Sequence, residues 1–263
     1  MKILFATVCN DEYALGCQVM LYSMKKNIKD FDKCDVKIYH NKIIAHLSNE
    51  NQDAIKKISS NIDFEHIDKP HYYLGKLPQK GNRSEGCKAA YLTLESFREY
   101  DYDKVILFDV DMLCIGDISE LFNSDIEFGI RGGNTGFVVL GKNYRTESIY
   151  YDLISMIPSH SGDAMDQGII NNYFLNVPRN LPRHYNDYPL HEMSKDSKIL
   201  HWAHYDHIKP WVLDFWKDKV DLFSDVKPYP YPNKAIGNVP IRGDKAAFDL
   251  WLKYEKNMNL ELE

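Results

Sequence analysis

The strongest constraint on the fold is a short apolar run that ends abruptly in two carboxylates. Residues 105–108 read Val-Ile-Leu-Phe and are followed by Asp109 and Asp111. Successive side chains of a strand point to opposite faces, so a run that is apolar at every position predicts a central strand covered by helices on both faces. Ligands of open parallel sheets bind at the carboxyl ends of the strands, which is where this pair falls. We therefore expect a layered α/β fold with a site at the end of this strand.

The rest of the chain predicts the same kind of fold, because short apolar runs alternate with segments that carry apolar residues at helical spacing. Such alternation implies a mostly parallel central sheet with helices on both faces. The expected strands are residues 2–9, 36–39, 62–67, 137–140 and 198–200, and the expected helices are 13–26, 49–59, 84–100, 148–156, 166–174 and 245–256. Residues 70–82, rich in Pro, Gly, Tyr and Lys, are expected to form a loop over the site.

Length and composition favour one folded domain. The chain has 263 residues, of which 44% are hydrophobic and 27% charged, as is typical of a globular domain that buries a sizeable core. From residue 178 onward the sequence becomes dense in Pro, Tyr, Trp and His. We interpret 178–263 as a lid and wrapping segment around a core of residues 1–177, within a single domain 1–263.

Charge and cysteine usage narrow the partners and the compartment. The net charge of -6 and pI near 5.9 argue against nucleic acid, whose binding rests on Lys and Arg at the phosphates. An anionic ligand must then be met by local cations, helix N-termini or a metal. The five scattered cysteines lack Cys-x-x-Cys spacing and are typical of reduced cytoplasmic thiols. No signal peptide or apolar stretch of about 20 residues is expected.

Asp109 and Asp111 are candidate metal ligands. Residues two apart on an extended chain point the same way, and their oxygens suit Mg²⁺ or Mn²⁺. Alternatively, the pair caps the next turn or is simply solvated. Two carboxylates on a buried strand end would repel each other unless a cation lay between them, which favours the metal.

A second cluster of candidate ligands lies between residues 201 and 211. His201, His204 and His207 occur there with Lys209, directly after the strand-like residues 198–200. A histidine that follows a strand can supply the nitrogen ligand beside two carboxylates, and a lysine can hold a phosphate as a point charge. A zinc site made of the three histidines stays open as an alternative.

Two further groups carry polar side chains suited to a sugar nucleotide. Asn and Gln offer donors and acceptors to hydroxyl groups, although acidic residues at a helix start are often only caps. At the end of the first strand, an asparagine could bond to a base edge and a tyrosine could stack on it, although Asn-Asp after a strand is usually a turn. The group suited to sugar hydroxyls comprises Asn134, Gly136, Asp163, Asp166 and Gln167. The group at the end of the first strand comprises Thr7, Cys9, Asn10 and Tyr13. Arg83 and Lys88 are further basic candidates.

Taken in chain order, these motifs resemble glycosyltransferase family 8, the retaining family of glycogenin and bacterial lipopolysaccharide galactosyltransferases. The resemblance spans roughly residues 2–215. The Asp-x-Asp motif falls at Asp109 and Asp111, Asn-x-Gly at Asn134, and Asp-Gln-Gly at Asp166. Residues 9–13 match the family's nucleotide site, except that Cys9 stands for the usual Thr.

The resemblance implies a Rossmann-like GT-A fold and transfer of a hexose or related sugar from a UDP-sugar to a glycan or glycoconjugate, with retention and an α-linkage. It further implies Mn²⁺ (or Mg²⁺) held by Asp109, Asp111 and His201. The implied site residues are Gln167, near the anomeric carbon, Asp166 and Asp163 on sugar hydroxyls, and Thr7, Cys9, Asn10, Tyr13, Lys88, Val110, Asn134, Gly136, His204 and Lys209 around the donor.

The sequence departs from the family in two places. The interval from His201 to Lys209 is two residues longer than usual, and His204 takes the place of the glycine that lets the backbone approach the diphosphate. Strict spacing for a basic donor contact falls at Tyr91 or Leu92, so Lys88, one turn earlier, is taken instead.

Two rival functions remain at this stage. One is a non-catalytic nucleotide-sugar-binding module, and the other is a metal-dependent phosphohydrolase, in which an Asp-x-Asp motif usually lies on the first strand. The sequence does not choose among sugars or acceptors, nor between a monomer and a homodimer.

Overall fold

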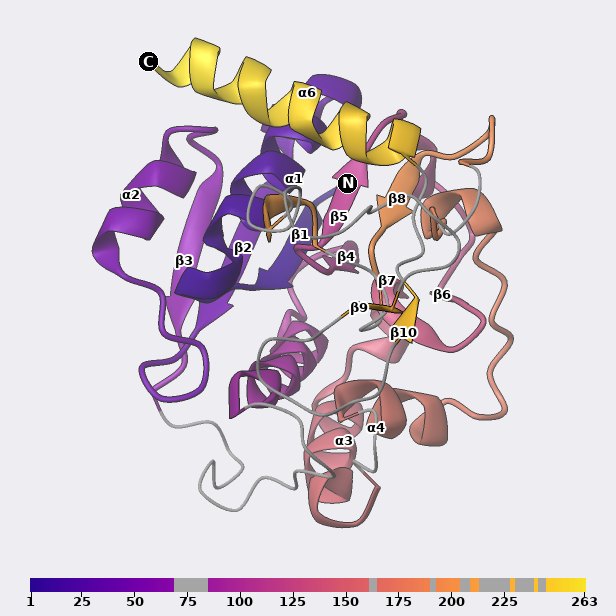
Figure 1. Cartoon of the computed structure of the whole chain (residues 1–263). Helices are drawn as coiled ribbons and strands as arrows, with labels where there is room; N and C mark the ends of the chain where they lie inside the picture. Colours follow the sequence, from indigo (N-terminus) through magenta and orange to yellow (C-terminus); the bar gives the residue numbers. More distant parts are fainter. Residues whose placement is uncertain are drawn as a thin grey trace.

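The computed structural model describes residues 1–68, 85–160, 165–189, 193–203, 209–212, 228–229, 239–240 and 245–263. Within these ranges the chain forms a layered α/β structure around one six-stranded sheet (Figure 1).

The central sheet has the strand order β3-β2-β1-β4-β7-β6. The first four of these strands are mutually parallel, β7 runs antiparallel to β4, and β6 runs antiparallel to β7. The expectation of a mostly parallel sheet is therefore confirmed. The strands are β1 (Ile3–Val8), β2 (Asp35–His40), β3 (Ile62–His66), β4 (Lys104–Phe108), β6 (Phe128–Arg131) and β7 (Asn134–Gly141).

Helices cover both faces of the sheet (Figure 1), because its central strands β1 and β4 are apolar on both sides. Alternate residues of β4 divide between two buried clusters: Ile106 and Phe108 face one, and Val105 and Leu107 face the other. The first cluster includes side chains of α1 (Ala14–Asn27), α2 (Asn49–Lys56) and α6 (Lys245–Leu262); the second includes side chains of η4, a 3₁₀ helix (Glu85–Arg98), α3 (Glu147–His160) and α4 (Asp166–Tyr173).

Two small sheets and several single turns complete the described fold. β5 (Met112–Cys114) pairs antiparallel with β8 (Ile199–His201), although the two are far apart in sequence. β9 (Pro228–Tyr229) pairs with β10 (Val239–Pro240). The remaining 3₁₀ turns are η1 (Asp11–Tyr13), η2 (Phe31–Lys33), η5 (Ser119–Leu121), η6 (Lys142–Tyr144), η7 (Arg183–Tyr185) and η8 (Pro210–Val212).

A two-residue turn joins β6 to β7. Arg131 and Asn134 are paired across the hairpin, and Gly132 and Gly133 between them have φ angles of 56° and 87°. Glycine adopts such positive φ values without the steric cost that a side chain would add. The side chain of Asn171 on α4 donates to the carbonyl oxygen of Gly133 at 2.6 Å, which fixes the turn over that helix.

The C-terminal helix α6 packs against α1 (Figure 1) and holds the segment that contains Lys209. Trp251 is fully buried, and its ring lies 6.2 Å from that of Trp211. The Trp211 ring in turn covers Gly16 of α1 so closely that a Cβ at position 16 would lie 2.5 Å from it. The chain from Lys209 to Trp211 is therefore clamped between two helices.

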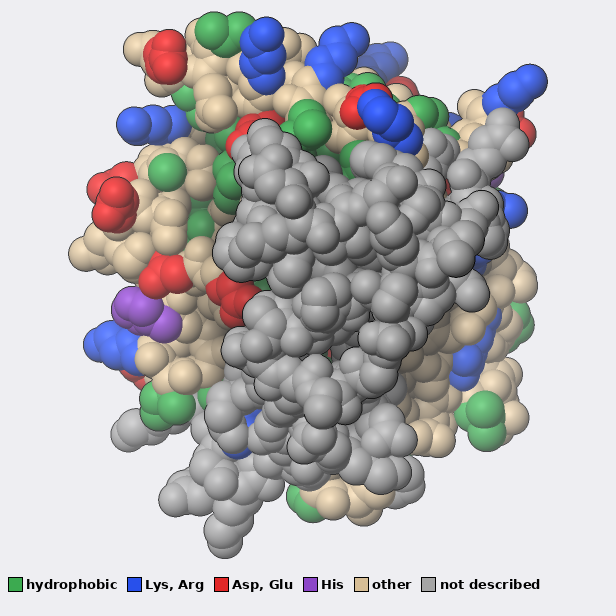
Figure 2. All heavy atoms as spheres, viewed as in Figure 1, with side chains coloured by type: hydrophobic (Ala, Val, Ile, Leu, Met, Phe, Trp, Pro, Cys, Tyr) green, Lys and Arg blue, Asp and Glu red, His purple; other side chains and the backbone are tan. Residues whose placement is uncertain are grey.

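The surface, the thiols and the helix lengths can be described for part of the chain. On the face drawn in Figure 2, the coloured Lys and Arg side chains lie dispersed among Asp and Glu instead of forming one basic patch. Cys9, Cys17, Cys34 and Cys114 are buried free thiols. None of the described helices is both long and apolar enough to cross a membrane.

The packing of α6 predicts a large loss of stability on truncation of Trp251. Trp251→Ala should lower the free energy of unfolding by about 3 to 5 kcal/mol, because it leaves a cavity between α6 and α1. Leu252→Ala, one residue along and 38% exposed, should cost less than about 1 kcal/mol. Urea denaturation of both variants tests this, and equal losses would contradict the packing.

Candidate metal centre

The two carboxylates lie where β4 ends and the chain turns into β5. The main-chain N–H of Asp109 donates to the carbonyl oxygen of Gly136 on β7 at 2.7 Å. The hydroxyl of Thr7 on β1 donates to the carbonyl oxygen of Phe108 at 2.7 Å. Hydrogen bonds from both neighbouring strands therefore fix the end of β4, just before Asp111.

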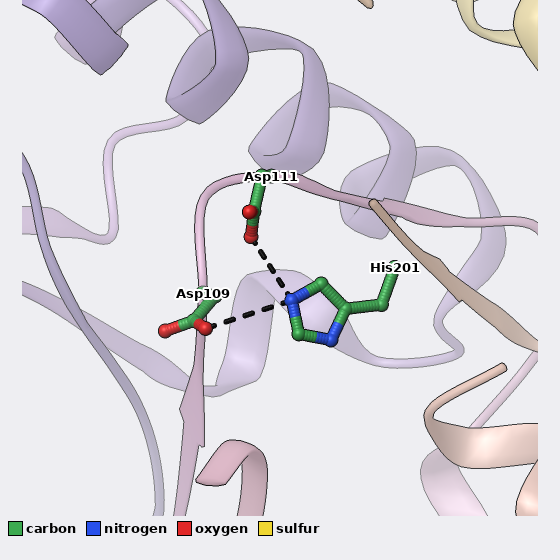
Figure 3. Close-up of side chains that lie close together, drawn as sticks. All are labelled: Asp109, Asp111 and His201. Atoms are coloured by element: carbon green, nitrogen blue, oxygen red, sulfur yellow. Dashed lines mark ion pairs between the residues drawn. The ribbon is translucent and has the colours of Figure 1, made fainter. Parts of the chain in front are cut away.

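His201 reaches the carboxylates through the pairing of β8 with β5. In this pairing Met112 lies opposite His201, and the N–H of Trp202 donates to the carbonyl oxygen of Asp111 at 3.0 Å. The Nε2 atom of His201 lies 3.1 Å from Oδ1 of Asp111 and 3.6 Å from Oδ2 of Asp109 (Figure 3). The predicted third ligand is thus brought to the predicted pair.

The geometry of these three side chains fits a divalent metal ion. One ligand atom from each lies within 4.8 Å of the others, as among the ligands of a single cation. Oδ1 of Asp111 is buried and has no hydrogen-bond partner among the described residues, a costly state that a cation would relieve. A Cβ on Gly136 would lie 2.3 Å from Cε1 of His201 and 2.7 Å from Oδ2 of Asp109, so only glycine leaves room here.

The two carboxylates have opposite pKa shifts because they share a site. Burial, and then the charge of Asp111, raises the pKa of Asp109 to about 7. Burial also opposes ionisation of Asp111, but the charge of Lys209 and the neighbouring His201 outweigh it and hold the pKa of Asp111 well below its usual range. Lys209 forms an ion pair with Asp111 and also donates to the carbonyl oxygen of Trp202.

Gln167 and Asp166 lie at the start of α4, next to β7. Oε1 of Gln167 accepts from Nδ2 of Asn134 and from the main-chain N–H of Thr135, both at 3.3 Å. Asp166 is buried and accepts from the hydroxyl of Thr93 at 3.0 Å. Burial raises its pKa to about 7, against the hydrogen bonds that lower it. The preceding residue, Met165, has a φ of 48°, a strained conformation of the kind that clusters at functional sites.

The predicted nucleotide residues lie at the end of β1, beside the Lys209 segment. Oδ1 of Asn10 accepts from the N–H of Tyr13 at 3.1 Å and caps η1, as the turn interpretation requires. The Tyr13 ring lies 5.5 Å from that of Trp211 in an edge-to-face contact. Cys9 is buried, and burial raises the pKa of its thiol well above the usual value.

The other predicted site residues fall into three groups. Thr7 and Val110 are buried, the former engaged in the contact to β4. Lys88 lies half-buried on η4. Asp163 and His204, together with His207, Arg83 and residues 70–82, lie outside the described residues, so the zinc alternative is not tested as a three-histidine set.

Three contacting residues were not expected from the sequence. Thr93 bonds to Asp166, Asn186 bonds to His201, and the Tyr188 ring lies 5.7 Å from the His201 ring. None belongs to a short motif. The only available signal was spacing: Thr93 lies close to Tyr91 and Leu92, where a basic donor contact was sought.

Comparison with known families identifies this arrangement. The sequence model of Glycosyl transferase family 8 matches residues 5–133, which include the end of β1 and both aspartates. Over this stretch the chain is similar to glycosyltransferase family 8. A comparison with curated proteins finds no match.

Solved glycosyltransferases share the fold of this chain. The galactosyltransferase LgtC with donor and acceptor sugar analogs superposes with a TM-score of 0.63 at 16% identity, covering 98% of this chain and 96% of LgtC. GlyE of Streptococcus pneumoniae TIGR4 gives 0.64 at 17% identity, and the bifunctional glycosyltransferase WbbM gives 0.59 at 15%. The match covers 100% and 80% of this chain but only 62% of GlyE and 47% of WbbM. At these identities the likeness shows the GT-A fold.

The crowding around Gly136 predicts that one added methyl group disturbs the candidate metal ligands Asp109, Asp111 and His201. Gly136→Ala should weaken Mn²⁺ binding by roughly tenfold or more, because the methyl displaces His201 or Asp109. Isothermal titration calorimetry measures this. Gly116→Ala is the control, since the atom nearest to its Cβ would be Cγ of the flexible Lys198 side chain, at 3.2 Å. Equal affinities for all three proteins would contradict the prediction.

The raised pKa of Asp166 predicts a pH-dependent stability. The folded protein holds this proton up to about pH 7, whereas the unfolded chain releases it near the ordinary value of 3.8. The contribution of Asp166 to the free energy of unfolding therefore falls as the pH rises between these values, by on the order of 1 kcal/mol per pH unit.

Urea denaturation in EDTA at pH 5, 6 and 7 tests this dependence. The free energy of unfolding of the wild type should fall with pH relative to that of Asp166→Asn. Replacing the exposed Asp53 of α2 by Asn should leave the wild-type dependence unchanged. A dependence in Asp166→Asn that parallels the wild type would argue against a raised pKa.

Proposed function

We propose that this protein is a metal-dependent retaining glycosyltransferase, which moves a hexose or related sugar from a UDP-sugar to a hydroxyl group of a glycan or glycoconjugate, forming an α-linkage. The observation that carries the proposal is the group of Asp109, Asp111 and His201 at the carboxyl end of β4, in a chain whose residues 5–133 match the family 8 model. LgtC, which covers most of this chain, was solved with donor and acceptor sugar analogs, and this supports a donor and an acceptor here.

The three ligands would hold Mn²⁺ or Mg²⁺ at the diphosphate of the donor. A bound divalent ion neutralises the charge that develops on a diphosphate leaving group. Lys209, paired with Asp111 and held in place by Trp211, brings a second positive charge to the same position. A lysine acts on phosphate oxygens as a point charge. The net charge of -6 makes these local cations necessary.

The sugar would lie between the metal group and α4. Gln167 is placed against β7 by Asn134 and Thr135, and we assign it to the neighbourhood of the anomeric carbon. The buried Asp166 would accept hydrogen bonds from sugar hydroxyls when ionised. Asp163 is proposed for the same task.

The nucleoside would lie beside the end of β1. Tyr13 offers a ring for stacking and Asn10 an amide for the base, while Cys9, Thr7 and Val110 would line the pocket. Lys88, His204 and Gly136 are proposed around the phosphates and sugar.

The C-terminal part of the chain would serve the acceptor side. We propose that residues 178–263 wrap the acceptor while residues 1–177 form the donor core, with His201 as the contribution of the wrapping segment to the metal group. The buried free thiols support a cytoplasmic location.

The test is metal-dependent release of UDP from a panel of UDP-sugars, with and without acceptor. Wild-type protein with Mn²⁺ should release UDP slowly from at least one sugar nucleotide, and EDTA should abolish the release. Asp109→Asn and Asp111→Asn should each lose at least about 100-fold of this activity, because each removes a charged ligand. NMR of the product glycoside then reports the anomeric configuration.

Asp117→Asn is the matched control, because Asp117 is another aspartate after the same strands whose carboxylate bonds to the main-chain N–H groups of Lys29 and Ser119. This variant should retain wild-type release. UDP-sugar binding without any turnover would favour the binding module. Phosphate release from simple phosphoesters without nucleotide would favour the phosphohydrolase.

A further inference from the structure

A chain of hydrogen bonds connects the main chain of β7 to His201 through two asparagines. The N–H of Gly136 donates to Oδ1 of Asn134 at 3.0 Å, and Nδ2 of Asn186 donates to the same oxygen at 2.9 Å. Oδ1 of Asn186 then lies 2.8 Å from Nδ1 of His201. We call Asn134, Asn186 and these bonds the amide relay.

The direction of each bond in the amide relay is set by the main chain. A main-chain N–H can only donate, so the atom of Asn134 that faces Gly136 must be its oxygen. Asn186 must therefore turn its NH₂ group toward Asn134, which leaves its oxygen facing His201. An amide oxygen only accepts, so Nδ1 of His201 carries the proton.

This assignment has a direct consequence for the metal group. A neutral imidazole carries one N–H, so protonation at Nδ1 leaves a lone pair at Nε2. Nε2 is the atom that faces Asp109 and Asp111, at 3.6 Å and 3.1 Å (Figure 3). The imidazole is thereby locked as a ligand and not as a donor to the carboxylates. Oδ1 of Asp111 agrees with this, because it finds no hydrogen-bond partner in the part of the chain that the structure describes.

A second branch of the amide relay orients Gln167. Nδ2 of Asn134 donates to Oε1 of Gln167, and the N–H of Thr135 donates to the same oxygen. With its oxygen engaged twice, Gln167 keeps its NH₂ group for other partners. Two adjacent N–H groups of β7 therefore determine which nitrogen of His201 carries the proton and which way the side-chain amide of Gln167 faces.

Asn186 is held too firmly to reorient. Its side chain is fully buried, and its main-chain oxygen accepts from the guanidinium group of Arg131. Its N–H donates to the carbonyl oxygen of Arg183 at 3.0 Å. The next residue, Asp187, accepts from the N–H of His201 at 2.8 Å, which ties Asn186 to the strand that carries the histidine.

We propose that Asn186 is a positioning residue, which fixes His201 as the Nδ1–H tautomer and, through Asn134, couples the metal ligand to the orientation of Gln167. The functional part of this inference rests on the proposed metal and donor site. The tautomer itself is independent of any ligand. Outer partners of this kind commonly contribute 10- to 100-fold to metal affinity.

The first experiment determines the tautomer in metal-free protein. Long-range ¹H–¹⁵N spectra at pH 8 in EDTA should show His201 as Nδ1–H, with its signals assigned by their loss in His201→Gln. In Asn186→Ala the proton should move toward Nε2, where Oδ1 of Asp111 becomes its acceptor. A wild-type His201 protonated at Nε2 overturns the proposal, whether or not any variant folds.

The second experiment measures Mn²⁺ affinity from the EPR signal of the free ion. Asn186→Ala should weaken binding about 10- to 100-fold. Asn186→Asp should recover most of this affinity, because it keeps an oxygen at Nδ1 of His201. The variant should still lower kcat for transfer, because the second oxygen of the new carboxylate would face Oδ1 of Asn134, and two acceptor oxygens repel each other. Wild-type affinity in Asn186→Ala overturns the proposal.

Asn61→Ala is the matched control for the loss of an asparagine that bonds within the fold. Asn61 donates to the carbonyl oxygens of Phe31 and Cys34 at the start of β3, the sheet edge opposite the site. It should lower the melting temperature but change neither the tautomer nor the Mn²⁺ affinity. If wild-type protein shows the Nδ1–H tautomer but binds no Mn²⁺, the hydrogen-bond assignment is supported and the metal proposal fails.

Discussion

The candidate site depends on one main-chain pairing, that of β5 with β8. β5 directly follows the two aspartates, and β8 ends in His201, almost 90 residues later in the chain. Without this pairing, the protein would present two carboxylates on a buried strand end with no nitrogen ligand beside them. With it, His201 lies within 4 Å of both carboxylates, and Lys209 is carried to Asp111 by the chain that follows. The electrostatic properties of the site are therefore a consequence of backbone hydrogen bonds between distant segments.

Local patterns were sufficient to predict the central strands and most helices. β1 and β4 are buried on both faces and read as apolar runs, whereas β2 and β3 keep buried apolar residues such as Ile38 and Ile62 between polar ones. β5 and β6 were missed. Each has only three or four residues and no alternation of its own, and each exists because a partner strand completes it. The antiparallel direction of β7 is likewise set by its hairpin with β6. α6 continues to Leu262, past the predicted end at residue 256, since Met258 still packs into the core.

In the site, too, residues that belong to short motifs could be predicted, whereas residues that act through contacts distant in sequence could not. Asp109, Asp111 and His201 could be predicted because motif spacing reports them. Asn186 and Thr93 could not, since each acts by bonding to a residue more than ten positions away and neither belongs to a short motif. Nor could any pattern report that Gly136 must lack a side chain: the reason is the imidazole of His201, which arrives from a different strand. Such positions are visible only once the strands are placed.

The length of the turn at Gly132 and Gly133 sets which side chains of β7 face the site. Neighbouring residues of a strand face opposite sides, so a slip of one residue in the hairpin would reverse the face of every side chain on β7. Asn134 would then turn away from Asn186, and a bulky residue would face His201 in place of Gly136. A one-residue insertion in this turn would thus turn the polar side chains of β7 away from the site, although no residue of the site would be lost. The length of a two-residue loop without side chains decides whether the polar groups of the site can meet at all.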